Sequence, residues 1–232
     1  MRHVIDEKPA LPDDLHGRLL YTARYVDDKD LTGKDAINIG CGHGWFELYA
    51  MSKGVSSIVG VEPTEEDLGV ARKYVGAPSA TFTCASGLDL PFPSGSFDSA
   101  FCWEVLEHLP KSSEDRFFSE VRRILKRGGV FYLSTPCRSL VATVSDPARW
   151  LIGHRHYLPN EVSQFASRNG FEPMRVTAVG RVVEVLAKWN LYVSKWVFHR
   201  KPFLQHHFQC RCDHEIIGGR GYTNVFLRMI AV

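Results

Sequence analysis

The sequence has 232 residues, which is enough for one large α/β domain with a substantial hydrophobic core. Its 28 basic and 26 acidic residues nearly cancel, so no global electrostatic field for nucleic-acid binding is implied, and we expect no nucleic-acid partner. Residues 1–30 mix charged with apolar positions and hold neither a signal-peptide core nor a membrane span, so we expect a cytoplasmic protein without a transmembrane segment.

The first elements of the chain lead into a glycine-rich turn. Apolar side chains recur near helical spacing over residues 13–26, which predicts a helix before the first strand. Residues 36–39 predict a short apolar strand, and Gly40, Gly42 and Gly44 follow it at alternate positions. Glycine permits backbone angles closed to other residues and lets a ligand lie against bare main chain. We therefore predict that this turn cradles a nucleotide at the carboxyl end of the strand.

The turn differs from two common nucleotide-binding motifs. The dinucleotide fingerprint requires glycine or alanine at its last position, where this chain has Trp45, so the spacing argues against NAD. A P-loop closes with Gly-Lys-Ser/Thr, and no such triplet follows Gly44, which argues against ATP.

An acid stands at the end of the next predicted strand. Residues 57–61 predict that strand, and Glu62 follows it, about 20 positions after Gly40, the spacing seen in related nucleotide sites. A carboxylate there can accept hydrogen bonds from both ribose hydroxyls. The sequence therefore predicts a ligand with an unphosphorylated ribose.

Strands and helical segments alternate along the rest of the chain. Residues 80–84 and 97–103 predict the third and fourth strands, and a helix follows over residues 112–126. Residues 130–134 predict the fifth strand, and residues 223–231 a closing strand. This alternation indicates a parallel, doubly wound α/β sheet.

Five segments of the sequence resemble the class I S-adenosylmethionine-dependent methyltransferases, especially the small-molecule branch with its ubiquinone-type and sugar-type members. They recur in the family's order within residues 15–180, and they are residues 39–44, 60–63, 90–98, 104–109 and 120–129. The resemblance implies a Rossmann-like, doubly wound, mainly parallel seven-stranded sheet with helices on both faces and a C-terminal elaboration. We expect a cofactor-binding domain over residues 1–180, and an extension over 181–232, a helical lid plus closing strand packed on the same domain.

The resemblance also implies S-adenosylmethionine as cofactor, S-adenosylhomocysteine as product and no metal. The expected cofactor-binding residues are Asn38, Gly40, Cys41, Gly42, Gly44, Glu62, Pro63, Ser86, Gly87, Leu88, Trp103 and Glu104. Asn38 and Ser86 stand where the family usually has acids. Asn38 keeps an acceptor oxygen but loses the charge that would face the ammonium group of the cofactor.

Two histidines are the expected catalytic residues. Methyl transfer from a sulfonium requires mainly an aligned acceptor and a managed proton. His108 follows the fourth strand, and we expect it to act as a general base or to position the acceptor, the alternative being a histidine that only shapes its loop. A helical turn there would place Glu104 and His108 on a common face. His156 lies in the segment after the fifth strand, which in the resembling family helps to form the acceptor pocket.

The function that these residues indicate is methyl transfer to a small-molecule acceptor, with an oxygen of a sugar, a quinone or another secondary metabolite preferred. The alternative is a non-catalytic methyltransferase-like protein that binds the cofactor or a partner. A second rival is an RNA or protein methyltransferase. The near-neutral charge and the absence of an Asn/Asp-Pro-Pro-Tyr/Phe motif at residues 102–105 argue against methylation of amino nitrogens of bases or glutamine.

The C-terminal region leaves two interpretations open. Residues 181–208 are aromatic and locally basic, which fits either a helix packed on the domain or a lid over an anionic or lipid-linked acceptor at a membrane surface. We expect Cys210, Cys212 and His214 to pack in an extended segment, because a single residue between the cysteines fits a zinc site poorly. The six cysteines are expected to be reduced, and the sequence leaves the oligomeric state open.

Overall fold

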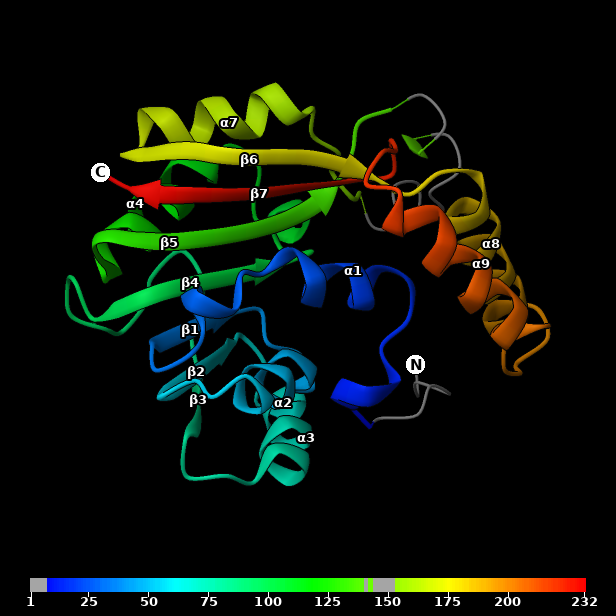
Figure 1. The fold of residues 1–232 in the computed structure, drawn as a ribbon, viewed down its shortest axis with the longest axis horizontal. Coiled ribbons are helices and arrows are strands. Elements are labelled where there is room, and N and C mark those ends of the chain that lie inside the picture. The colour runs from blue at the N-terminus through cyan, green and yellow to red at the C-terminus, as the bar shows by residue number, and fades with distance from the viewer. Residues whose placement is uncertain (1–7, 140–141, 144–152) are drawn as a thin grey trace.

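A computed structural model describes residues 8–139, 142–143 and 153–232. Seven strands form one sheet in the order β3-β2-β1-β4-β5-β7-β6, in which β7 runs antiparallel to both of its neighbours and the other pairs are parallel (Figure 1). The strands are β1 (Asp35–Ile39), β2 (Ser57–Glu62), β3 (Ala80–Cys84), β4 (Phe97–Trp103), β5 (Leu125–Pro136), β6 (Phe171–Val179) and β7 (Asn224–Ala231). The mainly parallel, seven-stranded sheet predicted from the sequence is confirmed.

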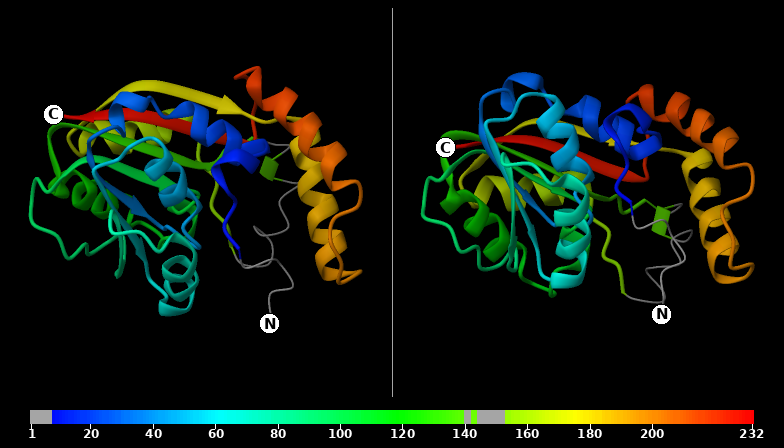
Figure 2. Two further views of the ribbon diagram at one scale, coloured as in Figure 1. Left: turned by 60° about the horizontal axis from the view of Figure 1, so that its bottom comes forward. Right: turned by 90° about the horizontal axis from the view of Figure 1, so that it is seen from below.

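Helices cover both faces of the sheet (Figures 1 and 2). The helices are α1 (Gly17–Tyr25), α2 (Trp45–Ser52), α3 (Glu65–Val75), α4 (Glu114–Ile124), α7 (Pro159–Arg168), α8 (Val182–Trp196) and α9 (Gln205–Ile217). Side chains of α1 and α2 join the hydrophobic core on one face, and side chains of α4 and α7 join the core on the other. Each face of the sheet is therefore buried, as the apolar strand sequences require.

Alternation along the central strands sorts their side chains between the two cores. Phe101 of β4 and Tyr132 of β5 stack at 5.4 Å between ring centroids in the core under α1 and α2. Cys102 and Phe131, one position away on the same strands, are fully buried in the core under α4 and α7. Successive side chains of a strand point to opposite faces, so these strands read as continuous apolar runs.

The order of the strands fixes where a ligand can bind. From β1 the chain moves outward to β2 and β3 on one side, and it then returns to place β4 and β5 on the other side of β1. The connection after β1 therefore leads to one side of the sheet, and the connection after β4 leads to the other. In open α/β sheets this switch point forms a crevice at the carboxyl ends of the strands. The glycine turn after β1 and the segment after β4 both lie there.

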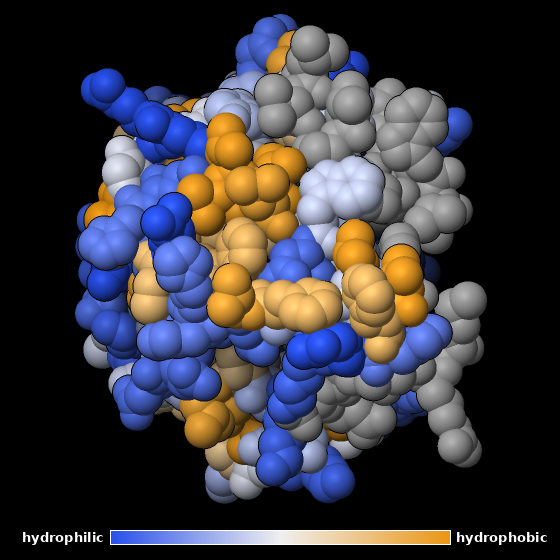
Figure 3. All heavy atoms as spheres, turned by 90° about the vertical axis from the view of Figure 1, so that its right-hand side faces the viewer, coloured by the Kyte–Doolittle hydropathy of each residue, from blue (hydrophilic) through white to orange (hydrophobic). Residues whose placement is uncertain are grey.

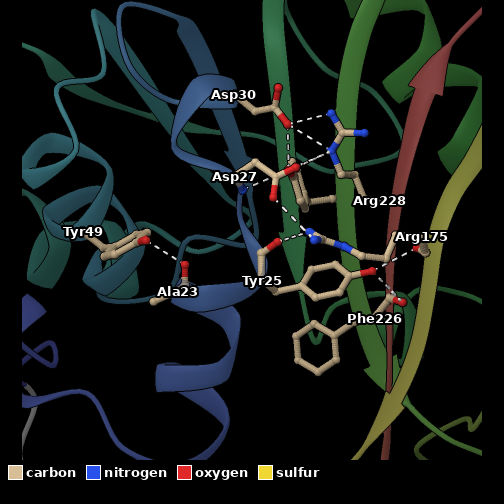
Figure 4. A network of polar contacts seen from close by, with 9 residues as sticks. Ala23, Tyr25, Asp27, Asp30, Tyr49, Arg175, Phe226 and Arg228 are labelled. Carbon is tan, nitrogen blue, oxygen red and sulfur yellow. Dashed lines mark hydrogen bonds and ion pairs between the residues drawn. The ribbon is translucent and has the colours of Figure 1, made fainter. Parts of the chain in front are cut away.

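A polar network joins the segment after α1 to the antiparallel part of the sheet (Figure 4). Asp30 accepts hydrogen bonds from the Tyr132 hydroxyl at 2.7 Å and from Arg228 Nε at 3.0 Å. The Tyr25 hydroxyl donates to the main-chain oxygens of Arg175 at 2.9 Å and Phe226 at 3.2 Å. Since Asp30 and Tyr25 are buried, these contacts satisfy polar groups that would otherwise be desolvated without partners.

Helices α8 and α9 form a hairpin beyond the carboxyl ends of β4 and β5 (Figures 1 and 2). At its base, Glu215 of α9 accepts hydrogen bonds from the N–H groups of Arg181 at 2.6 Å and Val183 at 2.9 Å, which satisfies the first turn of α8. Asp213 accepts from the Gly17 N–H and is 2.9 Å from His16 Nδ1 at the start of α1. Among the described residues, no helix is both long and apolar enough to cross a membrane.

The extended conformation predicted around Cys210 is wrong. Cys210, Cys212 and His214 all lie on α9, where Cys210 is exposed and Cys212 is buried against α1, whose Gly17 is its neighbour. Residues two positions apart point to different sides of a helix, which is why Cys210 and Cys212 differ in burial. The sequence around them has too few apolar residues to show the helical spacing. Within the described ranges, no three His, Cys, Asp or Glu side chains are arranged to hold a metal ion.

Candidate functional site

The glycine turn after β1 takes a form that other residues cannot adopt. Gly40, Gly42 and Gly44 all have positive φ, at 79°, 50° and 88°. A Cβ on Gly40 would lie 2.1 Å from a methyl carbon of Val105, and one on Gly44 would lie 2.5 Å from a methyl carbon of Val75. Backbone conformation and close packing therefore both require glycine at these two positions.

Hydrogen bonds attach this turn to the end of β2. The N–H groups of Gly40 and Cys41 both donate to the Val61 oxygen, at 2.7 and 3.0 Å. The Gly42 N–H donates to Oε2 of Glu62 at 3.0 Å. Burial raises the pKa of Glu62, and the Gly42 hydrogen bond acts in the opposite direction. The turn and the carboxylate therefore form one unit with a defined geometry.

A cavity of about 440 Å³ lies at the carboxyl ends of β1, β2 and β4. Seven of the residues predicted to bind the cofactor line it, together with one predicted catalytic histidine. These are Gly40, Glu62, Pro63, Ser86, Gly87, Trp103, Glu104 and His108. The sequence thus identified residues from four separate loops that the fold brings to one cavity.

Five predicted residues do not line this cavity. Gly42 and Gly44 shape the turn instead, as described above. Asn38 is buried in β1 and donates through Nδ2 to Oε1 of Glu47 at 2.9 Å. Cys41 is buried, and burial raises the pKa of its thiol.

Leu88 is the fifth of these residues. Its N–H donates to the Ser86 hydroxyl at 3.2 Å, and its side chain packs on the core under α4 and α7.

Trp103 contributes both to the core and to the cavity wall. Its ring packs on Phe46 at 5.4 Å between centroids, and the side chain is nearly buried. Its indole Nε1 is buried, yet it has no hydrogen-bond partner among the described residues. A buried N–H without a partner costs free energy.

Glu104 is held in an uncommon backbone conformation by two side chains from other elements. Its φ is 57°, in the left-handed region. Oε2 accepts from Arg18 of α1 at 2.7 Å, and Oε1 accepts from Ser134 of β5 at 2.7 Å. The predicted helical turn with Glu104 and His108 on one face is wrong, because a short 3₁₀ turn begins only at Leu106.

Sequence reasoning missed Arg18, Ser134 and the role of Glu107 beside them. Arg18 lies 86 positions from Glu104, so no local pattern connects the two. Glu107 is buried and accepts from the Thr135 hydroxyl at 3.0 Å. Burial and the neighbouring Glu104 carboxylate hold the pKa of Glu107 well above its usual range. The position of Glu107 shortly after the fourth strand was the available signal.

The two predicted catalytic histidines lie in different cavities. His108 lines the cavity at the glycine turn, and burial, together with His154, lowers its pKa. The rings of His108 and His154 meet edge to face, with centroids 4.4 Å apart. His156 is buried and lines a second cavity of about 490 Å³, which His154 and Arg155 also line. The loop that carries His154 therefore lines the second cavity and contacts His108 of the first.

Electrostatics distinguish the second cavity from the first. Five basic or imidazole side chains and two carboxylates line it, and they are Lys111, Arg138, His154, Arg155, His156, Glu114 and Glu161. Arg155 forms an ion pair with Glu114 and donates to the Leu109 oxygen at 2.6 Å. Part of the segment that the family resemblance assigns to the acceptor pocket, residues 144–152, lies outside the described residues.

Fold and site together define a Rossmann-like nucleotide-binding protein of the methyltransferase type. Residues 37–133 match the family described as "Methyltransferase domain". The chain is 32% identical over 169 residues to a ubiquinone biosynthesis O-methyltransferase of Methylococcus capsulatus, covering 65% of this chain and 68% of that protein. The chain belongs to the S-adenosylmethionine-dependent methyltransferase family.

Solved structures support the fold over nearly the whole chain. An S-adenosylmethionine-dependent methyltransferase of Mesorhizobium loti has a TM-score of 0.62 at 18% identity, covering 90% of this chain and 95% of that one. A geranyl diphosphate C-methyltransferase of Streptomyces coelicolor has a TM-score of 0.65 at 16% identity, covering 92% and 78%. The chain spans about half the length of several other curated relatives that it matches.

Proposed function

We propose that the protein transfers a methyl group from S-adenosylmethionine to an oxygen of a small-molecule acceptor. The observation that carries this proposal is the hydrogen bond between Gly42 and Glu62 at the cavity that His108 and Glu104 also line. A carboxylate fixed beside bare main chain suits a ribose and its attached chain. Titratable side chains at the other wall suit proton management at the acceptor.

The residues of the cavity fit the cofactor that the family implies. Glu62 uses one oxygen for Gly42, and a carboxylate has further lone pairs for the two ribose hydroxyls. Gly40 lines the cavity without a side chain of its own, so a ligand can lie against main chain there. When bound, S-adenosylmethionine supplies an activated methyl group on a sulfonium.

The side chains at the far wall would position the acceptor and take up its proton. The lowered pKa of His108 favours the neutral imidazole at pH 7, which is the form that can accept a proton. Arg18 and Ser134 occupy both oxygens of Glu104, so this carboxylate is held rather than free to rotate. We propose His108 as the general base and His156, in the second cavity, as an acceptor contact.

An oxygen acceptor is supported by the relative from Methylococcus capsulatus, whose name is that of an O-methyltransferase. The cavity wall combines the polar side chains of Glu104 and His108 with the apolar Leu109 and Pro110. This mixture suits a small molecule with both a hydroxyl group and apolar surface, such as a sugar, a quinone or another secondary metabolite. Among the described residues that line this cavity there is no Lys or Arg, so the cavity offers no basic groove for a nucleic-acid backbone.

Asn38 favours one alternative function. Its amide bonds to Glu47 and carries no charge, so β1 presents no carboxylate toward an ammonium group. A protein that binds the cofactor weakly, without turnover, and acts through a partner is consistent with this position and with Ser86.

Two measurements separate the proposal from this alternative. Calorimetry with S-adenosylhomocysteine tests binding, and transfer of a radiolabelled methyl group to a panel of phenols, catechols and sugars tests turnover. Binding that Glu62→Ala weakens, together with transfer to a hydroxyl, supports the proposal. Binding without transfer to any member of a wide panel supports the non-catalytic alternative, and failure to bind S-adenosylhomocysteine overturns both.

A further inference from the structure

The tip of the α8–α9 hairpin exposes large apolar side chains to solvent. Val197, Phe198, Phe203 and Leu204, which we call the tip patch, are 64%, 54%, 40% and 72% exposed. Figure 3 views the molecule from the end that carries the hairpin, and hydrophobic side chains gather in the middle of that face, with hydrophilic ones to their left and below. Scattered apolar residues are common on surfaces, but a contiguous group at a projecting turn indicates an interaction site.

The apolar surface continues along one side of α8. Val182, Leu186 and Trp189 recur at intervals of four and three residues, and all three are exposed. Residues at this spacing lie above one another on a helix, so they form a stripe. A helix that packed this stripe on its own domain would have buried it. The stripe and the tip patch are therefore two groups of exposed apolar side chains on the same hairpin.

Charge is strongly segregated along the hairpin. Residues 185–212 contain no Asp or Glu, but they contain five Lys or Arg and three His. The acids of the hairpin stand at its base, where Glu215 and Asp213 accept main-chain hydrogen bonds. Glu184 is buried there and accepts from Asn224 at 2.7 Å. Glu184 also pairs with Lys188 at 3.5 Å, and the other four Lys or Arg of residues 185–212 give the distal part of the hairpin a net positive charge.

The tip is held in the conformation that exposes its apolar side chains. Asn190 of α8 donates to the Phe203 oxygen at 2.6 Å and accepts from the Phe203 N–H at 3.2 Å, which ties the turn to the helix. The Arg200 guanidinium lies 4.1 Å from the centre of the Phe203 ring. A fixed turn that combines a cation with exposed aromatic rings loses little conformational freedom when it binds.

We propose that this tip docks on a bilayer surface with anionic head groups. Basic segments with an apolar face bind at the membrane interface, where the apolar side chains enter the head-group region and the cations meet anionic lipid. The absence of acids over 28 consecutive residues makes the tip complementary to such a surface. A protein partner would have to supply an acidic surface and an apolar groove together.

Docking by the tip would place the methyltransferase cavity near the lipid surface. The hairpin lies at the end of the molecule toward which β4 and β5 point, the end at which the cavity lies. Contacts also connect the two, because Asp213 of α9 bonds to the start of α1 and Arg18 of α1 bonds to Glu104 in the cavity wall. Amphipathic acceptors held in the bilayer would be within reach.

Vesicle sedimentation of the full chain tests the docking without cofactor or acceptor, so its outcome is independent of methyl transfer. Vesicles of phosphatidylcholine with phosphatidylglycerol are compared with vesicles of phosphatidylcholine alone. We expect binding to the anionic vesicles to be at least about tenfold stronger and to weaken as salt is raised. Equal binding to both vesicles, or to neither, overturns the proposal.

Two variants and two controls locate the surface. Phe198→Ser with Leu204→Ser, and separately Arg200→Glu, should each weaken binding to anionic vesicles by about tenfold or more. Met174→Ser, at an equally exposed apolar residue of β6, and Lys73→Glu on α3 should leave it unchanged. Unchanged melting temperatures establish that the variants fold. If the tip variants bind as the parent does, or if they abolish a dimer instead, the tip is not a membrane surface.

Discussion

The Gly42 N–H donates to Oε2 of Glu62 at 3.0 Å, and so joins the turn after one strand to the end of the next. Gly42 follows β1, and Glu62 is the last residue of β2. The hydrogen bond needs no ligand, since both groups belong to the protein. The Glu62 carboxylate is therefore oriented before a ribose binds, so less side-chain conformational entropy is lost on binding.

Glu62→Ala should weaken binding of S-adenosylhomocysteine by about 1 to 3 kcal/mol, because it removes a charged hydrogen-bond acceptor from the cavity. Isothermal calorimetry measures the change directly. Glu66→Ala, at an exposed acid that is the second residue of α3, is the matched control and should leave the affinity unchanged. Equal affinities for the parent and Glu62→Ala would show that the carboxylate does not contact the ligand.

Asn38→Asp should destabilise the protein by about 3 kcal/mol, because it replaces a buried donor with a second carboxyl group beside Glu47. This outcome is opposite to the tighter cofactor binding that the family pattern alone suggests. Urea unfolding measures the loss. The double variant Asn38→Asp with Glu47→Gln restores a donor and an acceptor, and it should recover most of the stability. No recovery would contradict the pairing.

Glu47 should make stability depend on pH. Burial raises its folded-state pKa to about 7, above the ordinary value of 4.5. Between these values the folded chain keeps a proton that the unfolded chain has released, so the free energy of unfolding falls as pH rises through this window. Above it the full cost is about 3 kcal/mol, and Glu47→Gln removes it.

Denaturation of the parent and Glu47→Gln across this pH range tests the sign. The variant should gain less than about 1 kcal/mol over the parent near pH 5 and about 3 kcal/mol near pH 8, because only the parent ionises. Glu66→Gln, which is exposed, should show no such trend. A difference that is constant with pH would contradict the raised pKa.

His108→Ala should lower kcat by about 10²- to 10⁴-fold with near-normal affinity for S-adenosylhomocysteine, if His108 is the base. Because its pKa is lowered, kcat/KM should fall only as pH drops below about 6.5. His154 contributes to the lowered pKa of His108, so His154→Phe should raise that pKa and move the fall of kcat/KM to higher pH. His156→Ala, in the second cavity, should raise the acceptor KM instead. Normal turnover in both alanine variants would refute both roles.

Asp30→Ala should cost about 3 kcal/mol of stability, since it leaves Arg228 and the Tyr132 hydroxyl nearly buried without their shared acceptor. Asp28→Ala is the matched control, because its ion pair with Lys53 is solvent-exposed and should be worth less than about 1 kcal/mol. Urea unfolding compares them. Similar losses for the two variants would show that the network in Figure 4 contributes no more than a surface pair.

The sequence predicted features that depend on local pattern. Gly40 and Gly44 were recognisable because positive φ and close packing leave no other residue, and Glu62 because strand length and crossover length fix its distance from the turn. The order of alternating strands and helices predicted the sheet for the same reason. These signals reside in spacing, which a single sequence displays.

Features that depend on distant residues were not predictable. Asn38 was expected to face the cofactor, but the direction of its side chain is decided by Glu47, which lies on the next helix. Arg18 reaches Glu104 only because α1 crosses the end of β4. Cys210 to His214 were placed in an extended segment because the apolar pattern there is too sparse to show a helical period.

The position of β7 between β5 and β6 has a consequence for how the chain folds during synthesis. β6 pairs only with β7 in this sheet, so it has no neighbour until β7 has been made. The ribosome releases β6, α8 and α9 before that strand, and during this interval their apolar surfaces are uncovered. The β1–β5 half can assemble first. In the last step, β7 pairs with β5 on one side and with β6 on the other. Aggregation or chaperone capture would occur before this step, while the edge of β5 and the strand β6 are unpaired.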